Sequence, residues 1–411
     1  MNRLTGVREI MKDIMTALKS DPSAKWINLS PGNPVILPEV EKMWRNYARE
    51  LVESDKFGEV IGRYGMTQGY EPFIASVVNS FNKNYAWNIT RDNVLITAGS
   101  QSLYFYCANA FAGIDSKGEL RRLLVPLVPD YTGYDGIVLQ EDNIVSQRPS
   151  IEILEKHRFK YRIDFDKLNV DDSIGAIICS RPCNPTGNIL TDDEVKTLAG
   201  LAAKKDIPLI IDSAYAPPYP NLAFTKMTPF YNDHVIHCVT LSKAGLPGER
   251  VGMAIGPERY ISAIEPFESN AGIHSSRFGQ ALAALAIDSG KLQELSESVI
   301  KPFYFNKLKL FQDVMDKEMP DIKWYLHKAE GSLFAWLWID EEWVNDLKLY
   351  QALKKKGLLI VPGSTFFPGL REEWDHKSRC IRISLTASDE DIEAGARILG
   401  TVLKQGANYD K

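Results

Sequence analysis

Residues 235–252 read VIHCVTLSKAGLPGERVG, and this stretch decides how the rest of the chain is interpreted. Residues 235–241 are apolar and rich in β-branched side chains, which predicts a buried strand. Lys243 follows two residues later, where a parallel strand would give way to a loop. An amine at the edge of an apolar sheet loses hydration, which lowers its pKa. A neutral amine attacks aldehydes, so Lys243 is either a candidate Schiff-base residue or, more commonly, an exposed lysine.

Polar groups around Lys243 suit an anion. Thr240 and Ser242 contribute hydroxyls, and Arg250 places a permanent cation seven residues further on. Hydroxyl and guanidinium donors together form strong hydrogen bonds to phosphate oxygens. The stretch therefore predicts a phosphate site beside the lysine.

The bulk properties narrow the class of protein. A chain of 411 residues is long enough for two domains, and its net charge of −5 gives no basic footprint for nucleic acid. Its apolar runs are too short to span a membrane, and residues 1–10 carry no signal-like apolar segment. The five cysteines are scattered and mostly lie in apolar runs, so we expect reduced core thiols in a cytoplasmic protein, with no zinc or other metal site.

Short apolar runs alternate with amphipathic segments in the first two thirds of the chain. The predicted strands are residues 94–97, 123–127, 176–179, 208–211, 235–241 and 251–255. Strand–helix alternation predicts an α/β fold with a mostly parallel, doubly wound sheet. We expect this large domain at residues 55–290, and a smaller α+β domain at residues 291–411 together with 1–54.

In such a sheet, ligands bind beyond the carboxyl ends of the strands, so the residues that follow each strand deserve comparison. After 94–97 come Gly99, Ser100 and Gln101, which open a helix and suit either an anion or an ordinary helix cap. After 123–127 comes Tyr131, whose ring could stack on a ligand or simply pack.

Two further strand ends carry polar motifs. The tetrapeptide Asn184-Pro-Thr-Gly187 follows 176–179 and has the composition of a turn. Asp212 ends the apolar run 208–211 and is followed by Tyr215. A carboxylate at that place is either a satisfied structural aspartate or the partner of a protonated ring nitrogen.

These residues together meet the needs of pyridoxal phosphate, which requires a lysine, an acid opposite its ring nitrogen and a phosphate cup. The chain resembles the fold-type I, aspartate-aminotransferase-like family of pyridoxal-phosphate enzymes, and within it the valine–pyruvate group. The motifs that carry the resemblance run almost end to end: SPGNP at 30–34, YGMTQG at 64–69, NPTG at 184–187, DSAY at 212–215, SK at 242–243, PGER at 247–250, PG at 362–363, FFPG at 366–369 and Arg382.

The resemblance implies a role for each site residue. Lys243 would hold the cofactor as a Schiff base and later move the substrate proton, while Asp212 would keep the ring nitrogen protonated. Tyr215 and Asn184 would donate to the ring oxygen. The phosphate would lie against Gly99, Ser100, Gln101, Thr240, Ser242 and Arg250, the ring against Tyr131, and the substrate carboxylate against Arg382, Gly32 and Asn184. Tyr64 would reach the partner subunit's phosphate, which implies a homodimer with shared sites.

The substrate implied by the resemblance is an aliphatic amino acid, with valine and alanine exchanged against pyruvate and 2-oxoisovalerate in a ping-pong reaction. Arg277 leaves an alternative open, because dicarboxylate-preferring relatives place a second arginine there. A helix-starting arginine is the other interpretation. A lyase on the same scaffold is a further alternative. A pyridoxal-phosphate-binding regulator would need a DNA-binding module, for which the residues before Trp26 are too few. Residues 113–118 have the glycine spacing of a nucleotide phosphate loop, but Glu119 and Leu120 stand where Lys and Ser or Thr are needed.

Overall fold

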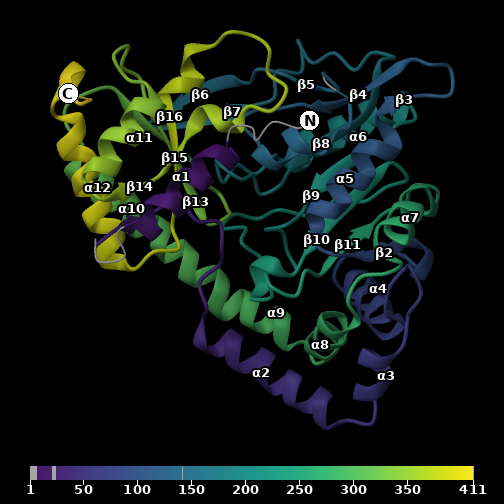
Figure 1. Cartoon of the computed structure of the whole chain (residues 1–411). Coiled ribbons are helices and arrows are strands. Elements are labelled where there is room, and N and C mark those ends of the chain that lie inside the picture. Colours follow the sequence, from purple (N-terminus) through teal and green to yellow (C-terminus); the bar gives the residue numbers. More distant parts are fainter. Residues whose placement is uncertain (1–6, 21–24, 141, 411) are drawn as a thin grey trace.

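The computed structural model describes residues 7–20, 25–140 and 142–410. These residues form two large β-sheets, a two-stranded sheet and the helices that cover them (Figure 1). The larger sheet has the order β2-β11-β10-β9-β8-β4-β3, with β5 paired to β4. Its strands are β2 Val94–Thr97, β3 Gly113–Ile114, β4 Leu120–Val125, β5 Ile144–Ser146, β8 Ile174–Ser180, β9 Leu209–Asp212, β10 Val235–Thr240 and β11 Gly252–Ile255.

This sheet confirms the predicted α/β fold class. The pairs β10–β9, β9–β8, β8–β4 and β4–β5 are parallel, whereas β11 runs antiparallel to both of its neighbours. All six predicted strands are present, with ends that differ by no more than a few residues. Helix α5 Ser100–Phe111 opens after Gly99, as predicted, and α6 Asp192–Lys204 follows β8 along the chain.

Helices cover both faces of the larger sheet, because its central strands are buried at every residue and therefore have no face open to water. Successive side chains of a strand point to opposite faces. In β2, Leu95 belongs to the core cluster that includes residues of α5, α6 and α7 Glu258–Gly272, whereas Val94 and Ile96 belong to the cluster that includes residues of α2 Pro38–Glu53, α4 Glu71–Tyr85 and α8 Arg277–Asp288. The helices of this second layer are α2 Pro38–Glu53, α3 Phe57–Gly62, α4 Glu71–Tyr85, α8 Arg277–Asp288 and α9 Lys291–Leu295.

The second sheet has the order β15-β16-β13-β12-β7-β6. Its strands are β6 Ser150–Leu154, β7 Arg158–Arg162, β12 Trp324–His327, β13 Phe334–Ile339, β15 Val361–Pro362 and β16 Cys380–Ser384. The strands β6 and β7 come from the middle of the chain, and β7 pairs in parallel with β12. The division into residues 55–290 and residues 1–54 with 291–411 stays a prediction, and it did not anticipate this pairing.

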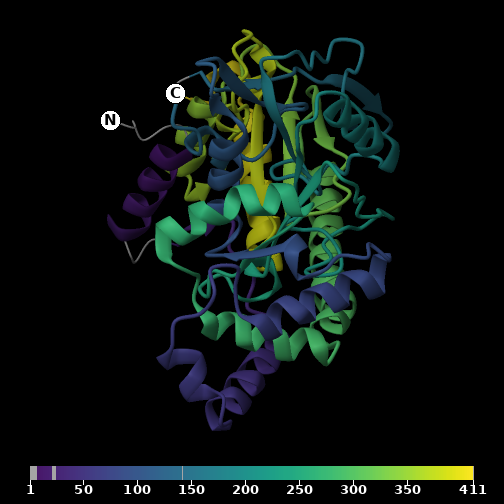
Figure 2. The same ribbon diagram turned by 90° about the vertical axis from the view of Figure 1, so that its right-hand side faces the viewer.

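Helices from both ends of the chain pack against the second sheet. The helices are α1 Val7–Ser20, α10 Lys301–Glu318, α11 Asp346–Lys355 and α12 Asp389–Leu403. A π-helical turn, Ser296–Ile300, joins α9 to α10, and this run connects the layer around α2 and α8 with α12 (Figures 1 and 2). Ile27 and Asn28 form β1, which pairs in parallel with β14 Leu358–Leu359.

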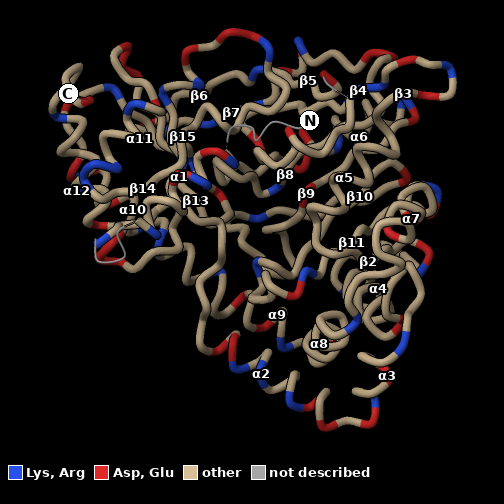
Figure 3. Tube along the Cα trace, viewed as in Figure 1, with Lys and Arg blue, Asp and Glu red and all other residues tan. Residues whose placement is uncertain are grey.

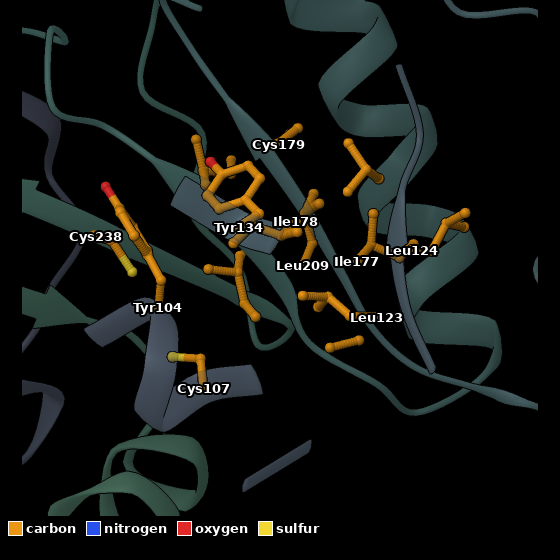
Figure 4. Packing of buried hydrophobic residues seen from close by; sticks show 14 of the residues in the cluster. Tyr104, Cys107, Leu123, Leu124, Tyr134, Ile177, Ile178, Cys179, Leu209 and Cys238 are labelled. Atoms are coloured by element: carbon orange, nitrogen blue, oxygen red, sulfur yellow. The ribbon is translucent and has the colours of Figure 1, made fainter. Parts of the chain in front are cut away.

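The core beneath the larger sheet contains cysteines and tyrosines as well as aliphatic residues (Figure 4). All five cysteines are buried and free, which confirms the expectation of reduced core thiols. Acidic and basic residues both occur along the exposed helix α2 (Figure 3). Within the described ranges, no helix combines the length and the apolar character that a bilayer crossing demands.

Candidate active site

A cavity of about 530 Å³ opens at the carboxyl ends of β8, β9 and β10, on the side that faces the second sheet. Most of the residues predicted from the sequence line it. They are Gly32, Ser100, Gln101, Tyr131, Asn184, Asp212, Tyr215, Thr240, Ser242, Lys243, Arg250 and Arg382. The carboxyl ends of the strands therefore bring together groups that are far apart in the sequence, as expected for a sheet of this kind.

Lys243 lies in a 3-10 turn, Ser242–Ala244, directly after β10. Its Nζ donates a hydrogen bond of 2.7 Å to the carbonyl of Gly32. Burial, together with the positive charges of Arg382 and Arg250, lowers the pKa of Lys243 to about 8, although Asp212 opposes this shift. The amine is therefore far closer to its nucleophilic form at neutral pH than an exposed lysine would be.

The turn that carries Lys243 is fixed by packing from α2. Trp44 Nε1 donates a hydrogen bond of 2.9 Å to the carbonyl of Ala244. Gly245 has a φ of +99°, and a Cβ there would lie 2.8 Å from both Trp44 and Val40. Only glycine combines this conformation with so close an approach.

Asp212 ends β9 and is buried beneath the cavity. Its carboxylate accepts hydrogen bonds from the backbone N–H of Ala214 at 3.0 Å and from the hydroxyl of Tyr134 at 3.3 Å. Tyr104 is a further hydroxyl partner. Burial raises the pKa of Asp212, although these donors and the charge of Lys243 act in the opposite direction. A cationic N–H that docked here would stabilise the carboxylate, because a buried anion without an adjacent cation is costly.

The residues predicted to bind the phosphate form a cradle at the N-terminus of α5. Arg250 Nη1 donates to Ser242 Oγ at 3.1 Å, and Thr240 Oγ1 lies 2.9 Å from the same hydroxyl. A Cβ on Gly99 would stand 2.1 Å from Arg250 Nη2, so the guanidinium can rest there only against glycine. The first N–H groups of α5 and this guanidinium together present positive charge to one place.

Arg382 is buried on β16 and is aimed at the opposite end of the cavity. Its Nη1 donates to Asn184 Oδ1 at 3.1 Å, and its Nη2 donates to the carbonyl of Ser30 at 2.7 Å. The guanidinium stacks over Phe334 with a distance of 4.1 Å to the ring centroid. Burial lowers the pKa of Arg382 to about 10, so it remains a cation at neutral pH. Its Nε finds no hydrogen-bond partner among the described residues.

Two tyrosines form the walls between these charged ends. Tyr131 donates from its hydroxyl to Gln101 Oε1 at 3.1 Å, which holds its ring at the start of α5. Tyr215 is buried, with its ring centroid 5.9 Å from Lys243 Nζ. Burial and the charge of Asp212 raise the pKa of Tyr215 well above its ordinary value, so its hydroxyl stays protonated and can donate.

Tyr64 and Arg277 lie outside this cavity. Tyr64 is 84 % exposed and makes an edge contact with His274 beside a second cavity of about 560 Å³. Arg277 lines that second cavity and donates to the Glu59 carboxylate at 3.2 Å and to the carbonyls of Glu59 and Arg63. Within this chain, then, neither side chain reaches Lys243.

The sequence interpretation missed several residues of the cavity. The two hydroxyl partners of Asp212, Tyr104 and Tyr134, were not singled out, although Tyr104 lies one helical turn after Ser100. The carbonyl of Ser30 and the ring of Phe334 support Arg382. Residues of α1 form another wall of the cavity. Ser30 belongs to the SPGNP motif, whereas no local motif marks the other residues, because only the tertiary fold brings them to the site.

The residues present fit pyridoxal phosphate. The buried Asp212 lacks a neighbouring cation in its hydrogen-bond set, and the Gly99–Arg250 cradle is shaped for an anion. Lys243 lies between them as an amine of lowered pKa. These groups match the ring nitrogen, the phosphate and the aldehyde of the cofactor respectively.

Known proteins resemble this chain throughout its length. The model of the family described as aminotransferase class I and II matches residues 143–399. The valine–pyruvate aminotransferase of Escherichia coli (strain K12) is 37 % identical over 403 residues, which are 98 % of this chain and 96 % of that protein. The solved structure of valine–pyruvate aminotransferase AvtA from Salmonella typhimurium LT2 superposes with a TM-score of 0.87 at 35 % identity, covering 96 % of this chain and 98 % of the other.

More distant structures share the fold. LysN from Thermus thermophilus, an α-aminoadipate aminotransferase solved with N-(5′-phosphopyridoxyl)-L-leucine, has a TM-score of 0.77 at 20 % identity and covers 98 % of this chain and 95 % of its own. The sequence matches extend across both sheets and the cavity between them. The chain belongs to the class I and II aminotransferases, pyridoxal-phosphate-dependent enzymes of fold type I.

Proposed function

We propose that this aminotransferase moves an amino group between an aliphatic L-amino acid of the valine or alanine type and a 2-oxo acid such as pyruvate or 2-oxoisovalerate, in a ping-pong sequence. One observation carries the proposal. A lysine of lowered pKa, a buried carboxylate, an anion cradle and a buried arginine surround a single cavity of about 530 Å³. The similarity to enzymes named for valine and pyruvate supports the substrate class.

The cofactor would be held at three points. Lys243 would bind its aldehyde carbon, Asp212 would face its ring nitrogen, and Arg250 with Ser100, Gln101, Thr240, Ser242 and Gly99 would receive its phosphate. Tyr215 and Asn184 would donate to the ring oxygen, and Tyr131 would lie against the ring. Bound in this way, the cofactor supplies a carbonyl group for the amine and a ring that accepts the electrons left when Cα loses its proton.

The chain's own residues would position the substrate and move its proton. Arg382 would grip the α-carboxylate through its planar fork, with Asn184 and the Gly32 backbone beside it. Lys243, once free, would carry the proton to and from Cα as a general base, for which its pKa of about 8 is well suited. The buried hydroxyls of Tyr104 and Tyr134 would keep Asp212 oriented.

The test is turnover with a panel of amino acids, scored by the 2-oxo acid formed. Wild-type enzyme should convert valine and alanine, and Lys243→Ala should lower kcat by at least ~10³-fold because both the attachment point and the base are lost. Near wild-type turnover in Lys243→Ala would refute the mechanism. Circular dichroism of the variant verifies that it folds.

Two alternatives predict different results in that assay. A dicarboxylate-specific enzyme would prefer aspartate or glutamate, but Arg277 is bonded to Glu59 of its own chain, which supports the aliphatic substrate. A lyase would release ammonia or carbon dioxide. A transaminase instead passes the amino group on and stops after one equivalent when no 2-oxo acid is supplied.

We also propose a homodimer with shared active sites, in which Tyr64 of one subunit reaches the phosphate of the other. The support is the exposure of Tyr64 at 84 % together with the exposed Ile61 and Met66 beside it. Free cysteines throughout the chain support a cytoplasmic location. Sedimentation of the holoenzyme should give twice the mass of one chain, and a monomer with full activity would refute shared sites.

A further inference from the structure

One wall of the active-site cavity is not explained by the cofactor or the carboxylate site. It consists of four residues of α1, Met11, Ile14, Met15 and Leu18. Their spacing of i, i+3, i+4 and i+7 places them on one face of the helix. All four side chains are apolar, so this wall offers dispersion contacts rather than hydrogen bonds.

The helix is anchored to the second sheet and its helices. Asp13 accepts hydrogen bonds from the Tyr350 hydroxyl at 2.6 Å and from Lys354 Nζ at 2.7 Å, both from α11. Although partial burial alone would raise it, these two bonds lower the pKa of Asp13. Ile14 is only 1 % exposed and belongs to the core that contains Leu29. The wall is therefore a fixed part of the cavity.

The wall presents free apolar surface to the cavity. Met15 lines the cavity yet is 49 % exposed, and Met11 and Leu18 are half-buried beside it. Methionine is flexible and polarizable, so it adapts its shape to an apolar group. An aliphatic side chain bound in the cavity would remove this surface from water.

The charges of the cavity support the same kind of occupant. The lysine and arginine side chains in its lining are Lys243, Arg250 and Arg382, and each already has a proposed role. Arg277, the candidate for a second carboxylate, lies in the other cavity against Glu59. A side-chain carboxylate would therefore meet an apolar helix face where it needs a cation, which is unfavourable.

We propose that α1 is the specificity element of this enzyme, with Met11, Met15 and Leu18 contacting the aliphatic side chain of the amino acid. This inference rests on the proposed function and deepens it, because it names the residues that distinguish a branched chain from a methyl group or a carboxylate. Valine buries more apolar surface against this wall than alanine, which has a single methyl group. The contact therefore adds more affinity for valine than for alanine.

The experiment compares valine with alanine in the holoenzyme. The double variant Met11→Ala/Met15→Ala should lose ~10-fold in kcat/KM for valine, while the value for alanine changes less than about twofold. Thr16→Ala is the matched control, since Thr16 is exposed on the opposite face of α1 and should leave both values unchanged. A second variant, Met15→Arg, should raise the ratio of glutamate to valine turnover.

The outcomes separate this inference from the proposed function. The role of α1 would be overturned if the double variant kept the wild-type ratio of kcat/KM for valine to kcat/KM for alanine. It would equally be overturned if Met15→Arg failed to raise the ratio of glutamate to valine turnover. In either case wild-type turnover of alanine would leave the proposed function intact. A wild-type enzyme that converts neither valine nor alanine would instead refute the proposed function.

Discussion

Arg382 shows at the scale of one residue how burial prepares a binding group. The guanidinium stacks between Phe334 and Phe366. Two of its nitrogens donate hydrogen bonds to Asn184 Oδ1 and to the Ser30 carbonyl. Its Nε has no partner among the described residues. A buried cation with spare donors is costly unless a ligand pairs with it, so the carboxylate of an amino acid suits this place.

Arg382→Lys tests this role. Lysine keeps the charge but loses the planar fork, so KM for valine and alanine should rise ~10- to 100-fold, with a smaller change in kcat. Steady-state kinetics on the holoenzyme measure this split. Asn184 and Ser30 remain as in the wild type, and an unchanged KM would show that the substrate carboxylate binds elsewhere.

The lysine, the aspartate and the NPTG motif could be predicted from the sequence because each comes within a few residues of the end of an apolar run. The run fixes the strand, and the strand fixes the edge of the sheet to which the next residues belong. Tyr104 and Tyr134 could not be assigned in this way. Their contact with Asp212 depends on how α5 and the loop after β4 pack, and that packing is not encoded in any local pattern.

The N-terminus of α5 is the element on which the proposed phosphate site depends. Gly99 has a φ of +91° and lies against the Arg250 guanidinium, so the helix start and the arginine share one small space. Any side chain at residue 99 must displace Arg250 or unwind the first turn. The two parts of the phosphate cradle are thus coupled through a single glycine.

Gly99→Ala should therefore weaken cofactor binding by ~10-fold or more and destabilise the protein by about 1–3 kcal/mol. The affinity is measured by titrating apoenzyme with pyridoxal phosphate, and the stability by denaturant unfolding. Gly248→Ala is the matched control, because a Cβ there meets nothing within 4 Å. Equal effects of the two substitutions would contradict the account of the cradle.

Other elements lay beyond sequence-based prediction. Strand β7 contains Lys160, which is buried and paired with Glu330, and Arg158, which binds Asp316 through two nitrogens. Without these partners, a run with three basic residues resembles an exposed loop. The partners lie more than 150 residues away in the sequence, so only the folded chain reveals the strand. The same reason explains why the α1 wall was missed.

At the scale of the whole molecule, three histidines are buried as neutral groups. Burial lowers the pKa of His237 to about 4 and those of His327 and His376 to about 3. His237 shows how neutrality is maintained, since Nε2 donates to the Phe230 carbonyl and Nδ1 accepts from Ser213. The three histidines lie in different parts of the fold, so their protonation affects the stability of the whole molecule.

The unfolded chain binds protons at these histidines near pH 6.5, whereas the folded chain does not until the pH falls to about 4 or below. Because the unfolded state then binds more protons, stability rises with pH in this window and is lost on acidification. Each histidine should cost about 1.4 kcal/mol per pH unit below 6.5. Urea unfolding at pH 6.5, 5.75 and 5 measures the slope, and His237→Gln should reduce it. Burial also raises the pKa of Asp130 to about 7 and that of Asp135 to about 6, which opposes the histidine contribution equally in both proteins. The difference between the two slopes therefore isolates His237, and equal slopes would contradict a buried neutral His237.

The central claim is that Lys243 is the residue that binds the cofactor covalently. Its Nζ lies in the same cavity as Asp212, Arg250 and Arg382, and its pKa is lowered to about 8. The most direct measurement is borohydride reduction of the holoenzyme followed by peptide mapping. One pyridoxyl group per chain is expected, on the peptide that contains Lys243. Attachment to any other lysine, or none after full reconstitution, would contradict it.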